Sequence, residues 1–103
     1  MSYALINKMT SKPGKRDEVT KILLESGKAF DDNPNCILYV VSKDKKDENV
    51  LWIQDVWVDE ISHQEAMSDT IMREYIAKAF PLLVGMPEQI EIELAGGKND
   101  FAQ

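Results

Sequence analysis

Residues 51–67 read LWIQDVWVDEISHQEAM and predict a strand that passes directly into a helix. The first part is an apolar and aromatic run, which is typical of a β-strand. Asp59 and Glu60 follow, and a short helix is expected to begin near them and to end at about Ser68. This helix carries His63, the only histidine of the chain. A chemical site is therefore expected where the strand meets the helix.

The predicted strand at 50–58 is largely apolar on both faces, since alternate side chains of a strand point to opposite sides of a sheet. One face carries Leu51, Ile53, Asp55 and Trp57. The other face carries Trp52, Gln54, Val56 and Val58. We expect helices to cover the first face, and we assign Trp52 to a contact with a second subunit.

The chain before this stretch predicts two further strands and a helix. Residues 2–10 alternate, and residues 36–42 form a β-branched and aromatic run, so both are expected to be strands. Between them, residues 15–30 place apolar side chains at helical spacing, and Pro34 requires the helix to have ended. The polar loop that follows 36–42 is short, which favours an antiparallel hairpin with 50–58.

The chain after this stretch predicts one more helix and one more strand. Ser68 and Asp69 are suitable caps for a new helix, which Pro81 is expected to kink or end. The expected apolar stripe of this helix is Ile71, Met72, Tyr75, Ile76, Ala79, Phe80 and Leu83. Residues 88–95 alternate, so we expect Ile90, Ile92 and Leu94 to point inward and Gln89, Glu91 and Glu93 to point outward.

The resulting order is β-α-β-β-α-β with the second helical region split. This order predicts an α+β, ferredoxin-like fold with a four-stranded antiparallel sheet and helices on one face. Residues 1–95 are expected to form a single domain. Residues 96–103 are interpreted as a flexible C-terminal tail, in which Phe101 is an anchor for a partner.

The uncovered face of such a sheet predicts a homodimer. Three of the predicted strands, at 2–10, 36–42 and 50–58, carry apolar residues on both faces, and an exposed apolar sheet face of that size favours a partner. A second copy, packed sheet to sheet, covers the face by two-fold symmetry.

Composition excludes several classes of protein. The chain has 12 basic and 18 acidic residues, for a net charge of −6, which argues against a nucleic-acid surface. One cysteine, Cys36, leaves no intramolecular disulfide framework and no cysteine-based zinc site. No apolar run approaches the roughly 20 residues of a membrane span, and the start of the sequence has no secretory pattern. We expect a cytoplasmic protein with no membrane contact.

Three segments together resemble the antibiotic biosynthesis monooxygenase family. They are Lys12–Glu18, Asn33–Cys36 with Tyr39, and Asp55–Glu60 followed by His63. The resemblance covers residues 3–95. The sequence departs from the family at Asp55, where Glu is common, and at Asn35, where Gly is frequent.

The resemblance implies a dimeric α+β barrel in which two sheets face each other. For some members it implies oxygenation of quinols or polyketide anthrones without metal or flavin. Other relatives degrade haem or isomerise small signalling molecules. The haem-degrading relatives also use a Trp near the second helix and a later His, and neither residue type occurs between Ala66 and Lys78. Haem degradation by that set of residues is therefore disfavoured.

His63 and Asn7 are the candidate catalytic residues. An imidazole has an ordinary pKa of about 6.5, which suits a general base, although His63 could equally be a packing residue of its helix. Asn7 interrupts an apolar strand face and is placed similarly to the pocket Asn of haem-degrading relatives. The alternative for Asn7 is a strand-edge amide bonded to backbone or water.

Trp57, Tyr75 and Asp55 are the candidate substrate-binding residues. Trp57 and Tyr75 could hold a flat ring, and the alternative for both is a place in the core. Asp55 shares a face with Trp57, and its carboxylate needs a partner if buried. Arg73 or a backbone amide is the expected structural partner.

These residues predict a monooxygenase that oxidises a small aromatic quinol or anthrone-type substrate with O2. No cofactor and no metal are expected. Two alternatives stay open: a binding module for small molecules without turnover, and an isomerase or haem-binding relative on the same fold. A dinucleotide enzyme is disfavoured because no glycine-rich turn joins a strand to a helix.

Overall fold

Strands β1 (Tyr3–Thr10) and β3 (Val50–Trp57) form the centre of an antiparallel sheet in the computed structural model, which describes residues 2–98. β2 (Cys36–Lys43) flanks β3, and β4 (Glu88–Ile92) flanks β1. The strand order β2-β3-β1-β4 confirms the predicted ferredoxin-like fold.

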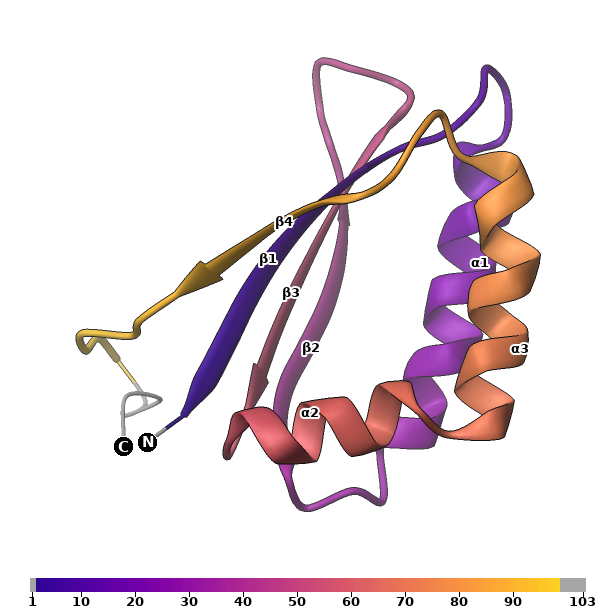
Figure 1. Ribbon diagram of the computed structural model, residues 1–103. Coiled ribbons are helices and arrows are strands. Elements are labelled where there is room, and N and C mark those ends of the chain that lie inside the picture. The colour runs from indigo at the N-terminus through magenta and orange to yellow at the C-terminus, as the bar shows by residue number, and fades with distance from the viewer. Residues whose placement is uncertain (1, 99–103) are drawn as a thin grey trace.

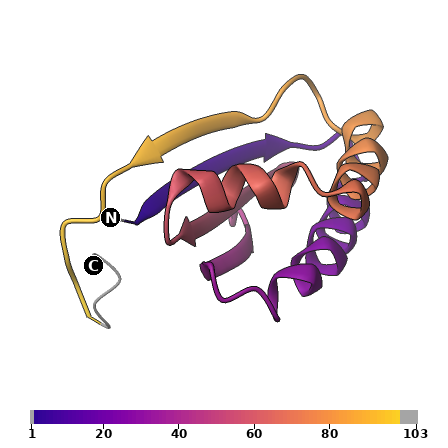
Figure 2. The ribbon, with the colours of Figure 1, turned by 60° about the horizontal axis from the view of Figure 1, so that its bottom comes forward.

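The helices lie on one side of this sheet (Figure 1). α1 (Arg16–Gly27) and α3 (Thr70–Ala79) run side by side in opposite directions, and α2 (Glu60–Met67) lies across one end of the space between them and the sheet (Figures 1 and 2). Short 3-10 turns, η1 (Lys28–Phe30) and η2 (Phe80–Leu82), extend α1 and α3. Within residues 2–98, no helix has the length and apolar character needed to cross a membrane.

Two aspartates produce the predicted break in the second helical region. The Asp59 carboxylate accepts a hydrogen bond from Ser62 N at 2.8 Å and starts α2. Asp69 accepts from Ile71 N and Met72 N, at 3.1 and 3.3 Å, and starts α3. Each such cap stabilises a helix by about 1 kcal/mol. The caps fix the angle between the two helices, which carries α2 across the end of the sheet.

The helices cover the face of the sheet that the sequence of β3 predicts to be covered. Leu51, Ile53, Asp55 and Trp57 are all buried on it. The strand register places Leu5 opposite Asp55 and Asn7 opposite Ile53, so these β1 residues share that face. The first strand therefore brings an amide, and the third a carboxylate, to the side that the helices cover.

The other face of the sheet is open to solvent at several apolar positions. Val40, Gln54, Ile6 and Ile90 lie in one register row across the four strands. Val40 is 38% exposed and Ile90 56%. The expectation that Ile90 points inward and Gln89 outward is therefore wrong: Gln89 pairs with Asn7 on the covered face. Alternation shows which residues share a face, but which face is covered depends on the register with β1.

Two members of the expected stripe on α3 are also exposed, Ile71 at 59% and Phe80 at 44%. Met72 and Ala79 are buried, and a helix buries a stripe of only about 100°. Ile71 and Phe80 lie at the two margins of that stripe, so neither belongs to the core.

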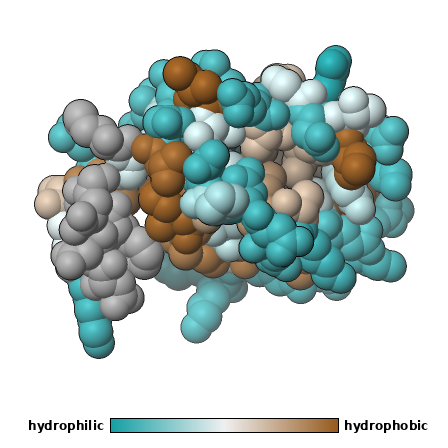
Figure 3. All heavy atoms as spheres, turned by 90° about the horizontal axis from the view of Figure 1, so that it is seen from below, coloured by the Kyte–Doolittle hydropathy of each residue, from teal (hydrophilic) through white to brown (hydrophobic). Residues whose placement is uncertain are grey.

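Viewed from below, hydrophobic side chains (brown) reach the surface in patches among hydrophilic ones (teal) (Figure 3).

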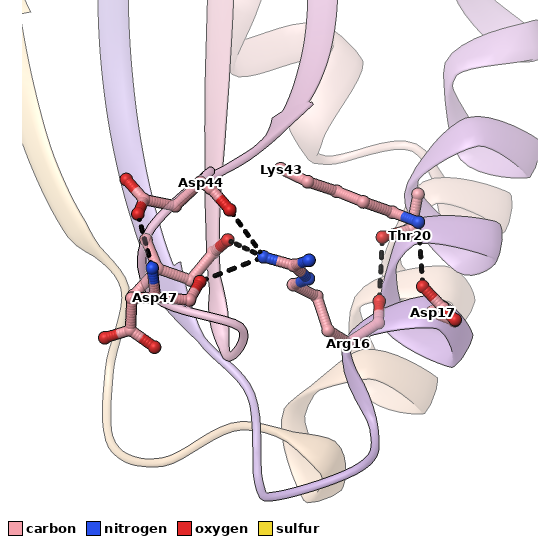
Figure 4. Close-up of polar contacts among 7 residues, drawn as sticks. Arg16, Asp17, Thr20, Lys43, Asp44 and Asp47 are labelled. Atoms are coloured by element: carbon pink, nitrogen blue, oxygen red, sulfur yellow. Dashed lines mark hydrogen bonds and ion pairs between the residues drawn. The ribbon is translucent and has the colours of Figure 1, made fainter.

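The loop between β2 and β3 is held against the start of α1 by one guanidinium group. Arg16 Nη1 donates to the carbonyl oxygens of Asp44 and Asp47 at 2.9 Å and of Val50 at 3.3 Å (Figure 4). The Asp44 carboxylate orders the loop from within and accepts from Trp52 Nε1 at 2.9 Å. Hydrogen bonding lowers the pKa of Asp44 to about 2, with the Trp52 indole as the largest cause.

Two expectations about the chain end have different outcomes. β4 ends at Ile92 rather than at residue 95. Residues 99–103, which include Phe101 and the end of the tail predicted to be flexible, lie outside the described residues.

Candidate active site

A cavity of about 300 Å³ lies between the covered face of the sheet and the three helices. Its walls come from all three helices, from all four strands, and from the segment that leads into β4. The polar side chains on its walls are Asn7, Ser26, Tyr39, Asp55, His63, Tyr75 and Gln89. Sequence reasoning singled out four of these: Asn7, Asp55, His63 and Tyr75.

The apolar part of the wall is rich in methionine. Four of the five methionines of the chain line the cavity, namely Met9, Met67, Met72 and Met86. Phe30 and Phe80 add aromatic surface. Methionine is flexible and polarisable and makes favourable contacts with aromatic rings, so this wall suits a flat apolar ligand and can adapt to its outline.

Asp55 is the buried charge of the cavity. Asp55 is only 5% exposed. Oδ2 accepts a hydrogen bond from Trp57 Nε1 at 2.8 Å and lies 3.8 Å from His63 Nε2. Oδ1 has no hydrogen-bond partner among the described residues. The expected partner Arg73 is exposed on α3, so that expectation is wrong: the indole two residues along the same strand face is the donor.

His63 is held by two aromatic rings and by this carboxylate. Its ring centroid lies 5.3 Å from that of Tyr3 and 5.6 Å from that of Trp57. The cap at Asp59 sets the start of α2 and thereby the height of His63 above the sheet. The imidazole is 16% exposed, which leaves an edge accessible from the cavity that it lines.

Burial dominates the electrostatics of this group of residues. It raises the pKa of Asp55, while the Trp57 hydrogen bond and the nearby His63 act in the opposite direction. Burial, together with the charge of Asp55, raises the pKa of the Cys36 thiol to about 11. The Tyr39 hydroxyl has its pKa raised to about 12, again chiefly by burial. Cys36 and Tyr39 therefore stay protonated at neutral pH.

Asn7 and Gln89 form a second polar region. They are paired in register on β1 and β4 and both line the cavity. Within residues 2–98, neither side-chain amide makes a hydrogen bond. Sequence reasoning missed Gln89 because it was expected on the outer face. The signal that could have found it is the register between the first and last strands.

Trp57 and Tyr75 have different positions relative to the cavity. Tyr75 lies on the wall, with Lys78 Nζ 5.3 Å from the centre of its ring. Trp57 has no exposed surface and packs with Phe30 and Met72 in a core cluster behind the wall. Its indole holds the Asp55 carboxylate in place from that side.

The hydroxyl groups of Ser26 and Tyr39 are used within the protein. Both donate to Leu23 O, at 2.9 and 3.1 Å. Gly27 lets the Tyr39 ring approach α1 this closely, because a Cβ at Gly27 would lie 2.5 Å from Tyr39 Cε2. These contacts fix the α1 side of the cavity and leave the ligand-facing chemistry to the other polar groups. Among the described residues, no cluster of three or more His, Cys, Asp or Glu is arranged to hold a metal ion.

Comparison with known proteins identifies the class to which this fold and cavity belong. The family model described as antibiotic biosynthesis monooxygenase matches residues 2–78. The chain belongs to this family. No curated protein sequence matches it significantly.

Solved structures agree with this assignment. A candidate antibiotic biosynthesis monooxygenase from Chloroflexus aurantiacus J-10-fl is 35% identical, with a TM-score of 0.85 and with 97% of this chain and 99% of that one covered. SnoaB from Streptomyces nogalater, a cofactor-independent oxygenase, has a TM-score of 0.82 at 13% identity, over 96% and 98% of the two chains. A third neighbour, from Caulobacter crescentus CB15, is 17% identical with a TM-score of 0.85, over 92% and 91%. The last two are similar in fold.

Proposed function

We propose that this protein is a monooxygenase that oxidises a small aromatic quinol or anthrone-type substrate with O2, without a metal or flavin. The observation that carries the proposal is the buried pair of Asp55 and His63 in the wall of an apolar, methionine-rich cavity. Membership of the monooxygenase family supports it, as does the fold shared with a cofactor-independent oxygenase.

The proposed reaction requires a proton acceptor and a site that contains little water. An electron-rich hydroquinone or anthrone that has lost a proton can transfer an electron to O2 directly. The resulting radicals combine through a new C–O bond to give a hydroperoxide. Cleavage of its O–O bond with loss of one water leaves a new carbonyl group, so one oxygen atom enters the product and the other leaves as water. The substrate supplies all the electrons.

His63 is the proposed proton acceptor. The imidazolium that forms would lie 3.8 Å from Asp55 Oδ2, and a carboxylate at that distance in a buried site stabilises it. Trp57 fixes the carboxylate through its 2.8 Å hydrogen bond. The buried carboxylate thus favours proton transfer to His63 in a mostly apolar cavity.

Asn7 and Tyr75 are the proposed contacts to the rest of the substrate. The Asn7 amide can donate to the oxyanion that proton loss creates. Tyr75 and the methionines can enclose the ring, since both lie on the cavity wall. In this proposal Trp57 does not contact the substrate ring. It acts indirectly, by holding the Asp55 carboxylate in position.

We also propose that the protein is a homodimer through the open face of the sheet. Val40 and Ile90 are exposed on that face, in a row with Ile6. A second copy would cover all of them by two-fold symmetry.

Oxygen uptake tests the proposed reaction. The purified protein, treated with a chelator, is mixed with a panel of hydroquinones and anthrones, and uptake is compared with the same mixture lacking protein. Turnover above autoxidation for any member supports the proposal. Ligand-induced shifts in melting temperature without oxygen uptake would instead support a binding module.

A further inference from the structure

The exposed part of the cavity wall is confined to one short stretch of the chain. Three of the lining residues are exposed to solvent, namely Phe80, Met86 and Gln89. They belong to η2, to the segment before β4 and to β4, which follow one another along the chain. The other lining residues are buried or half-buried. These three side chains therefore form the mouth of the cavity.

Met86 is held at this mouth by the backbone on both sides. Val84 N donates a hydrogen bond to Thr10 O at 2.8 Å, and two residues after Met86 the chain enters β4 and pairs with β1. Gly85, with φ of 72°, turns the chain between these two anchors. The Met86 residue is 78% exposed, yet it lines the cavity. Its thioether is therefore open to small solutes and also lies where a ligand enters.

The other sulfur atoms around the cavity are better protected. Met72 is only 5% exposed, and Met9 and Met67 are half-buried. Burial raises the pKa of the Cys36 thiol to about 11, and a protonated thiol is a poor nucleophile. Because an oxidant has to reach the sulfur atom, oxidation among the described residues should begin at Met86.

We propose that Met86 is an oxidation site whose sulfoxide weakens the binding of apolar ligands in the cavity. The oxidant is hydrogen peroxide. Its O–O bond breaks, one oxygen atom forms a bond to the Met86 sulfur, and the other leaves as water. The sulfur loses two electrons and the peroxide gains them.

The effect on binding follows from the polarity of the sulfoxide. Oxidation converts a flexible apolar side chain into a polar one, so an aromatic ring at the mouth loses an apolar contact and has to displace water from the new S–O group. Methionine sulfoxide reductases restore the thioether, so the change is reversible. For its effect on turnover this inference rests on the proposed function, but ligand binding can be measured without turnover.

Peptide mapping after graded treatment with hydrogen peroxide tests the site. Trypsin releases residues 79–98 as one peptide, in which Met86 is the sole methionine. Residues 47–73 form another peptide, which carries Met67 and Met72. Tandem mass spectrometry should show that Met86 gains an oxygen atom several times faster than either of these two. Equal rates at Met86 and Met72 overturn the proposal.

Titration with N-phenyl-1-naphthylamine, a neutral aromatic dye that fluoresces in apolar sites, tests the effect on the cavity. Its dissociation constant should rise at least about threefold once Met86 is oxidised. Methionine sulfoxide reductases with dithiothreitol should restore the affinity, whereas dithiothreitol alone, which reverses a disulfide through Cys36, should not. Unchanged affinity after oxidation of Met86 overturns the proposal, as does failure of the dye to bind the untreated protein.

Three variants assign the effect to this side chain. Met86→Leu keeps an apolar side chain of similar volume without sulfur, so its affinity should stay within about twofold of the wild type before and after peroxide. Met86→Gln places a polar group at the mouth and should weaken dye binding at least about threefold without peroxide. Val84→Gln is the matched control, because Val84 is 56% exposed in the same segment and does not line the cavity. A peroxide effect in Met86→Leu as large as in the wild type overturns the role of Met86.

Oxygen uptake with an accepted hydroquinone separates this inference from the proposed function. Loss of dye affinity on oxidation, in a protein that takes up no oxygen, would remove the monooxygenase and leave the oxidation site. Oxygen uptake and dye affinity that both survive oxidation of Met86 would remove the oxidation site and leave the monooxygenase.

Discussion

His63 Nε2 lies 3.8 Å from Asp55 Oδ2, at the junction of α2 and β3. The histidine enters from a helix and the carboxylate from a strand, and Trp57 contacts both. Burial raises the pKa of the carboxylate, and the nearby imidazole acts against this rise. The predictions below follow from this pair and from the surfaces around it.

Activity is expected to fall in acid as the Asp55 carboxylate takes up a proton. Burial raises the pKa of Asp55, so the carboxylate becomes neutral at a higher pH than an ordinary aspartate. A neutral Asp55 no longer stabilises the imidazolium that forms on His63. In the wild type, kcat/KM should therefore fall as pH decreases through the raised pKa of Asp55, and this loss should be absent in Asp55→Asn. An unchanged acid limb in the variant would contradict a role for Asp55 in the pair.

Asp55→Asn is expected to stabilise the fold at neutral pH while it lowers activity. Since the pKa of Asp55 is raised in the native state, that state binds more protons than the unfolded chain between the ordinary and the raised pKa. The free energy of unfolding therefore decreases as pH rises through this window, and the loss is complete above it. The amide avoids this loss and keeps an acceptor for Trp57. Thermal unfolding at pH 7 should show a higher melting temperature for the variant than for the wild type, and this gain should vanish below about pH 4. Lower stability of the variant at pH 7 would contradict this account.

Gly27→Ala is expected to destabilise the protein, although alanine usually favours a helix. The new Cβ would lie 2.5 Å from Tyr39 Cε2, and the ring is held by its hydrogen bond to Leu23 O and by Phe30. Overpacking of this kind costs about 1–3 kcal/mol, measurable by denaturant unfolding. In a Tyr39→Leu background the cost should largely disappear. Equal costs in the two backgrounds would show that the ring is not the cause.

Ile90→Lys tests the sheet-to-sheet dimer. Ile90 is 56% exposed in the single chain, so the change should leave the monomer folded. A lysine at this position should lose apolar contact and place a charge in the proposed interface. Light scattering after size-exclusion chromatography should then show a shift from dimer to monomer. Lys98→Ala, another exposed position, serves as the control. A wild-type protein that is monomeric at low micromolar concentration would contradict the dimer.

The sequence was sufficient for most of the fold because its signals are local. Capping residues such as Asp69 mark the break between α2 and α3, and strand alternation places Asp55 and Trp57 on one face. The hydrogen bond between these two residues could also have been foreseen, since they are neighbours on that face.

The errors concern relations between distant segments. The side on which Gln89 and Ile90 lie is set by the register of an edge strand with β1, which alternation alone does not determine. The exposure of Phe80 depends on where the stripe of α3 meets the sheet and α1. The methionine-rich wall is assembled from β1, α2, α3 and the segment before β4, and the spacing of methionines along the sequence does not bring them together.

The most direct test of the central claim is the rate of oxygen uptake by His63→Ala with a hydroquinone that the wild type accepts. Gln64→Ala is the matched control, because Gln64 is the next residue on α2 and is exposed. If His63 accepts the proton, kcat/KM should fall by at least about a hundredfold in His63→Ala and stay within about twofold in the control. Turnover in His63→Ala equal to that of the wild type would contradict the account.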